Sequence, residues 1–349
     1  MFFPPGSALR AALLIGAVLA GAVGCGGGMA PVAEPTPTTS TPPPPPPPPV
    51  LWPLTGVESG AVPPRPALAV KIENSVSARP QTGLNAADMV WEEVVEGGIT
   101  RYVAVYHSTL PPQVGPVRSV RPMDAAIAGP LRGLFAFSGG TRPFIDAVAA
   151  AGLQLISQDS GAPGFMRITT RSAPHNVYAD PAALVGQADA GHLAPPPPAF
   201  EVAGAGAQPT AVLAGTPATT VQLKLTGMSR PQWTWSPPDG RWVRAEGTTP
   251  AVEADGTPLR AVNVVVLRVD VQNTSYLDPA GNPVPETVLT GTGAAVVATG
   301  GHTLQATWTK AGVTDRVILT GPDGMPVQLA AGNTWVELVP NGTGDVVIG

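Results

Sequence analysis

The stretch LFAFSGGTRPFIDAVAAAGLQLI, residues 134–156, decides the fold class of the first half of the chain. Residues 134–137 are apolar and short, which is typical of a buried strand, and Ser138-Gly139-Gly140 provides a turn. Residues 143–151 are then expected to form a helix that begins with a proline, and residues 153–156 the next strand. A strand, a helix and a strand in this order form a βαβ unit, so the sequence predicts parallel pairing and an α/β fold.

Neighbouring patterns extend this unit into a larger domain. Residues 68–72 alternate in side-chain character, and residues 101–107 have a second strand pattern. Between them, residues 88–95 are apolar enough for a strand or a short helix. We therefore expect an α/β N-terminal domain at residues 51–192 with at least one βαβ unit.

A second domain is expected beyond a linker. Residues 193–209 are rich in proline, alanine and glycine, which is typical of a linker between domains. Short alternating runs separated by turn residues then predict a smaller β-rich domain at residues 210–349. These runs are residues 221–225, 232–236, 262–271, 294–298, 304–309, 317–320 and 335–339. Two domains also suit a chain of 349 residues, because a single core rarely grows beyond roughly 250 residues.

The N-terminus predicts export and a lipid anchor. Residues 1–24 resemble a lipoprotein signal peptide, with Arg10, an apolar run and then small residues before Cys25. We expect Cys25 to carry acyl groups such as palmitate and to anchor the protein on the outer face of the bacterial cell membrane. The alternatives are an ordinary secretory signal or an uncleaved anchor, although the apolar run is shorter than the roughly 20 residues of a membrane-spanning helix.

Residues 25–50 predict a lipidated, proline-rich tether. They end in eight consecutive prolines at positions 42–49. Such a run extends by about 3.1 Å per residue as a polyproline II helix and keeps the folded part away from the membrane. The alternative is a ligand for an aromatic groove in another protein.

Composition narrows the classes of partner. The formal net charge is −5, whereas nucleic-acid binding needs a basic surface, so we expect no nucleic-acid partner. Cys25 is the only cysteine in the sequence, which excludes an intramolecular disulfide and a cysteine zinc site. The four histidines are scattered and no dinucleotide or phosphate-loop motif is present, so we expect neither a metal nor a cofactor.

Two segments contain candidate anion-binding residues. Arg118 and Arg121 lie in residues 115–122 and can offer forked donors to a carboxylate or phosphate. The alternative is that one of these arginines pairs with a nearby acid such as Glu92, Glu93, Glu96 or Asp124. Gly139 and Gly140 precede the expected helix, whose free N–H groups favour an anion, although most such turns only reverse the chain.

A third segment, residues 171–178, combines Arg171, His175 and Asn176. Histidine is the natural hydrogen-bonding or acid/base group near neutral pH, yet a lone histidine is more often structural. As catalytic candidates we consider His175 with Glu93 or Glu96, although clustered acids near a turn are more often a solvated edge.

Several segments resemble those of the YerB-type bacterial lipoproteins, a family of two-domain proteins of unknown function. The resemblance is carried by residues 53–56, 79–84, 87–88, 96–101, 115–122, 138–140, 173–178, 306–308 and 332–336. It implies a lipoprotein with an α/β N-terminal domain and a smaller β-rich C-terminal domain. It implies no activity and no catalytic residues.

Three functions remain open from the sequence. The first is a noncatalytic protein that binds an anionic envelope ligand through Arg118, Arg121 and Arg171, with His175 and Asn176 orienting it. The second is an envelope hydrolase or transferase that acts on a glycan or phosphate ester with His175 as acid/base. The third is an assembly or scaffold protein that binds an envelope protein through its β-rich domain.

Overall fold

The computed structural model describes residues 24, 26–28, 48–278 and 280–349. Cys25 and most of the predicted tether lie outside these residues. Contacts group Pro48–Gly349 into a single unit, separate from Met1–Pro47. No helix in the described part of the chain is long and apolar enough to cross a membrane.

A twelve-stranded sheet runs through both halves of this unit, in the order β10-β19-β18-β16-β21-β4-β5-β3-β6-β7, with β17 paired to β16 and β20 to β19. The first half of the chain supplies β3 (Leu68–Glu73), β4 (Met89–Val94), β5 (Thr100–Tyr106), β6 (Leu134–Phe137) and β7 (Gln154–Ser157). The second half supplies β10 (Thr216–Pro217), β16 (Asn263–Leu277), β17 (Pro283–Val288), β18 (Gly291–Thr299), β19 (His302–Lys310), β20 (Ile318–Thr320) and β21 (Thr334–Pro340).

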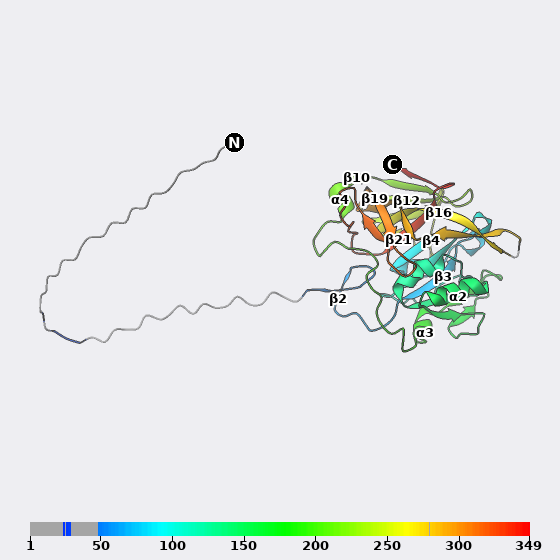
Figure 1. The fold of residues 1–349 in the computed structure, drawn as a ribbon, viewed down its shortest axis with the longest axis horizontal. Helices are drawn as coiled ribbons and strands as arrows, with labels where there is room; N and C mark the ends of the chain where they lie inside the picture. The colour runs from blue at the N-terminus through cyan, green and yellow to red at the C-terminus, as the bar shows by residue number, and fades with distance from the viewer. Residues whose placement is uncertain (1–23, 25, 29–47, 279) are drawn as a thin grey trace, which may run out of the picture. The chain divides into compact units, whose positions relative to one another are not determined.

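The two halves meet where β21 pairs with β4. The pairing is parallel and runs from Thr334 beside Met89 to Glu337 beside Glu92. Figure 1 shows these two strands side by side within the folded unit. Because the sheet is continuous across this pair, each half completes the hydrogen bonding of the other.

A smaller six-stranded sheet covers one face of the large sheet. It contains β11 (Thr220–Lys224), β12 (Pro231–Ser236), β13 (Arg241–Glu246), β14 (Thr249–Pro250), β15 (Arg260–Ala261) and β22 (Asp345–Ile348). Its Trp233 and Trp242 are fully buried and share one hydrophobic core with Val266 and Trp335 of the large sheet. Burial of two indole rings makes this contact a major source of stability.

Short helices lie on both faces of the large sheet. They are α1 (Asp124–Ala128), α2 (Arg142–Ala150), α3 (Pro181–Val185) and α4 (Thr210–Ala214), with 3₁₀ turns η1 (Val76–Ala78), η2 (Leu84–Ala86), η3 (Glu96–Gly98) and η4 (Gly129–Leu131). Ile127 of α1 and Val148 of α2 share a second core with Phe135 and Val265. α3 belongs to the opposite core through Leu184. The two-residue strands β1 (Val50–Leu51) and β2 (Glu58–Ser59) pair with each other, as do β8 (Phe165–Arg167) and β9 (Val177–Ala179).

The strands expected from alternation are confirmed, and residues 88–95 contain a strand rather than a helix. α2 connects β6 to β7, and these strands pair in parallel. β5 is antiparallel to both β3 and β4, so the sheet of the first half is mixed. In the expected linker, Phe200 is only 7% exposed and packs in the core, while the domain boundaries themselves stay a prediction.

The shared sheet predicts that the two halves fold together. Residues 48–349 should unfold in one cooperative transition, followed by tryptophan fluorescence and circular dichroism in urea. Fragments 51–192 and 210–349 should each stay unfolded, because each exposes an unpaired strand of the large sheet. Two separate transitions, or a fragment that folds alone, would contradict this.

His107 gives the fold a pH dependence. Its ring is 0% exposed, and neither ring nitrogen has a hydrogen-bond partner among the described residues. Burial lowers the pKa of His107 to about 4 from 6.5, and Arg65 adds to this effect. When the pH falls, the unfolded state therefore binds the proton first.

The contribution of His107 to stability should be fully present above about pH 6.5 and be lost as the pH falls towards 4. Urea midpoints measured between pH 7.5 and 4 should show a smaller loss in His107→Leu than in the unaltered protein. His302→Leu is the matched control, because the ring of His302 lies at the surface. Parallel curves for the unaltered protein and His107→Leu would rule out this role.

Candidate functional site

A buried carboxylate at the end of β3 forms the centre of the candidate site. Glu73 is 1% exposed, and both of its oxygens lie 3.0 Å from Nδ1 of His175. Its Oε2 also lies 3.4 Å from Nε of Arg118, and the Ser75 hydroxyl donates to Oε1 at 2.8 Å. The carboxylate is therefore surrounded by donors, as a buried charge requires.

Backbone hydrogen bonds bring the three predicted segments to this carboxylate. The N–H of Arg118 donates to the carbonyl of Lys71 on β3, and the carbonyl of Arg118 accepts from Ser138, just after β6. The next contact joins Val117 to β9, where its N–H donates to the carbonyl of Val177 at 2.7 Å. The segment 115–122 thus crosses the ends of β3 and β6 and holds the 171–178 segment beside them.

His175 and Arg118 lie at the surface side of Glu73. Their side chains are 27% and 23% exposed, whereas the Glu73 side chain is 2% exposed. Because Nδ1 of His175 faces the carboxylate, its Nε2 is the ring atom left for another molecule, and it has no hydrogen-bond partner among the described residues. The arrangement presents an oriented imidazole and a guanidinium side by side.

Arg121 is not part of this surface. Its Nε donates to Oε2 of Glu96 at 2.6 Å, and its Nη2 pairs with Oε1. Its backbone N–H donates to Asp124 at 2.6 Å, and burial lowers the pKa of the Arg121 guanidinium. For Arg121, the alternative of an ion pair with a nearby acid is confirmed.

Arg171 and Asn176 hold loops in place. Arg171 donates to the backbone carbonyls of Ser77 at 2.9 Å and of Pro80 at 2.5 Å. Asn176 accepts a hydrogen bond from Arg167 at 2.8 Å across the β8–β9 hairpin. Arg171 therefore ties the 171–178 segment to the loop after β3, near but not on the carboxylate.

Gly139 and Gly140 permit close packing at the turn before α2. A Cβ on Gly139 would lie 1.8 Å from Oδ2 of Asp159, and one on Gly140 would lie 2.4 Å from Cγ1 of Val120. The carbonyl of Gly139 also accepts from the N–H of Val120 at 3.0 Å. The close packing of this turn is sufficient to explain why glycine occupies both positions, without a bound anion.

The acid that contacts His175 was missed at the sequence level. Glu93 is fully buried and pairs with Lys71, and Glu96 lies in its own ion pairs, so neither hydrogen bonds to His175. Burial and a neighbouring carboxylate raise the pKa of Glu93 to about 8. Glu73 takes the position beside the imidazole instead.

The site shows no grouping of metal ligands. Among residues 48–278 and 280–349, no three His, Cys, Asp or Glu side chains are placed to hold a metal ion. The chemistry open to the site is hydrogen bonding and proton transfer by His175, and charge neutralisation by Arg118.

Two family models match the chain. Residues 54–194 match the N-terminal domain, and residues 221–336 the C-terminal domain, of "protein of unknown function (DUF3048)". The putative lipoprotein YerB of Bacillus subtilis (strain 168) is 35% identical over 130 residues, which are 36% of this chain and 39% of that relative. The match thus spans about two fifths of the relative.

A solved structure shows the same fold. The crystal structure of the YerB protein from Bacillus subtilis aligns with a TM-score of 0.71 at 22% identity, over 85% of this chain and 99% of that chain. The overall fold described above, which includes both halves of the chain, is therefore similar to a fold already seen in a crystal structure.

Because Arg118 and Arg121 have different surroundings, we expect their replacement by alanine to lower the free energy of unfolding by different amounts. Arg121→Ala leaves the buried Glu96 with only Arg101, at 3.3 Å, and should destabilise the protein by about 3 kcal/mol. Arg118→Ala should cost less than about 1 kcal/mol, because Glu73 keeps Ser75 and His175 as partners and the Arg118 side chain is itself partly exposed. Urea denaturation at pH 7 measures both, and equal midpoints for the two variants would contradict the assignment.

Proposed function

The chain belongs to the DUF3048 family of two-domain proteins, and from this premise we propose that it is an exported lipoprotein that binds an anionic ligand of the cell envelope through Arg118 and His175. The anchor rests on residues 1–24, which have the features of a lipoprotein signal, and on Cys25. The name of the relative, a putative lipoprotein, agrees with this. Lipidation of Cys25 would hold the folded part on the outer face of the cell membrane.

The pairing of Glu73 with both His175 and Arg118 carries the proposal for ligand binding. A buried carboxylate fixes the two side chains, so little side-chain entropy is lost when a ligand binds. Arg118 offers its exposed N–H groups to an anion, and Nε2 of His175 is the ring nitrogen left to hydrogen bond with the same ligand. Arg171 contributes by holding the loop that carries His175.

The fold class of the first half forms part of the proposal. We class this domain as α/β, because α2 connects the parallel strands β6 and β7, and β3 continues the parallel pairing on the other side of β6. The loops after β3 and β6 then meet at the same edge of the sheet. In α/β folds this edge commonly carries the ligand site.

The Glu73–His175 pair also favours a second candidate function, an envelope hydrolase or transferase. A carboxylate that fixes one imidazole nitrogen leaves the other as a general acid/base, which is the arrangement of catalytic histidines. In that case Arg118 would stabilise negative charge that develops on the substrate.

A thermal-shift screen of residues 48–349 tests both functions. Inorganic phosphate, pyrophosphate, phosphosugars and peptidoglycan fragments serve as probes, and a ligand at about 100 times its Kd should stabilise the fold by roughly 2.7 kcal/mol. Arg118→Ala and His175→Ala should lose the stabilisation. Arg142→Ala is the matched control and should keep it, because within residues 48–278 and 280–349 this exposed arginine pairs only with Asp146.

The outcomes separate the candidate functions. If a ligand stabilises Arg118→Ala by the same amount as the unaltered protein, that ligand does not bind at the Arg118–His175 site. Turnover of a probe that is lost in His175→Ala, with binding retained, would favour the enzyme. No stabilisation by any probe would leave the scaffold function, with a protein partner, as the better hypothesis.

A further inference from the structure

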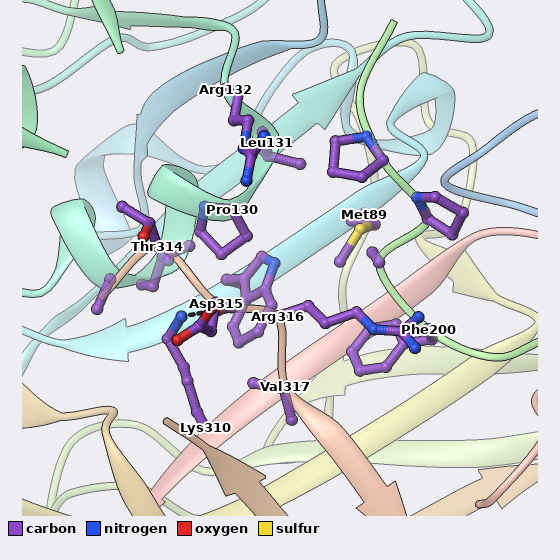
Figure 2. A pocket seen from close by; sticks show the side chains of 16 residues that line it. Met89, Pro130, Leu131, Arg132, Phe200, Lys310, Thr314, Asp315, Arg316 and Val317 are labelled. Atoms are coloured by element: carbon purple, nitrogen blue, oxygen red, sulfur yellow. Dashed lines mark hydrogen bonds between the residues drawn. The ribbon is translucent and has the colours of Figure 1, made fainter. Parts of the chain in front are cut away.

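A pocket separate from the proposed ligand site lies where four segments of the protein meet. Its volume is about 250 Å³, and neither Arg118 nor His175 lines it. Its walls come from β4, from the α1–η4 segment, from residues 197–200 and from residues 310–317 (Figure 2). Pockets between domains are common ligand sites, and both halves of this chain contribute here.

The interior of the pocket is formed by aromatic and aliphatic side chains. The rings of Trp91 and Phe200 stack at a centroid distance of 6.5 Å and an angle of 21°. Both rings are less than a tenth exposed, and Pro130 and Leu131 supply a second apolar wall. A space of this size accommodates one aromatic ring system or a short acyl chain.

Positive charge dominates the polar part of the lining. The lining contains Arg132, Lys310 and Arg316, against the single carboxylate of Asp315. In Figure 2, Arg132 and Lys310 approach from opposite sides, and Arg316 extends towards Phe200. The sign of this charge favours an anion over a neutral or cationic ligand.

Two of these cations already have partners. Lys310 donates to the backbone carbonyls of Val313, at 2.9 Å, and of Asp315. Arg316 pairs with Glu201 at 2.5 Å. The side chain of Arg132 makes no hydrogen bond or ion pair with any residue in 48–278 or 280–349, so its guanidinium is free to bind a ligand.

The backbone of Arg132 supports a role for its side chain. Arg132 ends η4 with φ 52° and ψ 32°, in the left-handed region, and it is the only non-glycine residue with positive φ in the described part of the chain. Glycine adopts this conformation without strain and is the usual residue at such a position. Arginine costs stability there, and no hydrogen bond or ion pair of its side chain within the described protein offsets that cost.

We propose that this pocket binds a small amphipathic anion. The ring or acyl group of the ligand packs against the Trp91–Phe200 pair on one side and against Pro130 and Leu131 on the other. Its carboxylate or phosphate pairs with the guanidinium of Arg132. The site is separate from the one at His175 and does not depend on its function.

Calorimetric titration of residues 48–349 with 1-naphthoate and with the neutral 1-naphthalenemethanol tests the proposal. The two probes share their ring system and differ in charge. The unaltered protein should bind the acid at least tenfold more tightly than the alcohol. Equal affinity for both, or no detectable binding of the acid at millimolar concentration, would overturn the proposal.

Arg132→Gly separates ligand binding from folding. It removes the guanidinium and the backbone strain together, so the variant should have a higher Tm and should lose the tenfold preference for the acid. Arg132→Lys keeps the charge and should keep part of the preference. Arg118→Ala, the control at the other site, should bind naphthoate unchanged, and a preference that survives Arg132→Gly would assign the anion to another residue.

Discussion

The guanidinium of Arg244 is the interaction on which the assembly of the two halves depends. It is 0% exposed and contacts Glu92 of β4 at 2.5 Å, Glu337 of β21 at 2.6 Å and Glu246 of its own strand at 2.8 Å. Glu92 and Glu337 are direct neighbours across the β4–β21 pair. Two adjacent buried carboxylates would repel each other, so the pairing of these strands requires the cation that the smaller sheet delivers.

The surroundings of Arg244 explain how such a charged group is accommodated. Rings of Tyr102, Trp233 and Trp335 lie 4.9–5.6 Å from the guanidinium carbon, and ring faces attract a cation. Burial raises the pKa of Glu337 well above its usual range, and the neighbouring Glu92 adds to this. The cluster therefore favours this arrangement of β4, β13 and β21, because separating these strands would leave a buried charge without a partner.

Local sequence patterns predicted most elements but not their partners. The alternation of residues 68–72 and the proline in the first turn of α2 report on neighbouring positions, whereas the pairing of Thr334 with Met89 joins distant parts of the chain. The site shows the same limit. Arg118 and His175 stood out by composition, but Glu73 resembled any acid at the end of a strand. Its one local signal is the period of two, which places it on the same face as the buried Lys71.

The pairing of β4 with β21, which the Arg244 cluster stabilises, also limits how the pocket beside Trp91 can change shape when a ligand binds. Met89 and Trp91 of β4 form the floor of the pocket, and β21 pairs with β4 where Val336 lies next to Trp91. Phe200, in the expected linker, is buried against this floor, and the linker segment is further fixed by the bridge from Val202 to Leu329. A hinge between the halves would have to break these contacts and expose the Arg244 cluster. Ligands therefore enter a preformed site, and selectivity depends on its fixed shape and on the charge at its rim rather than on closure of one domain over the other.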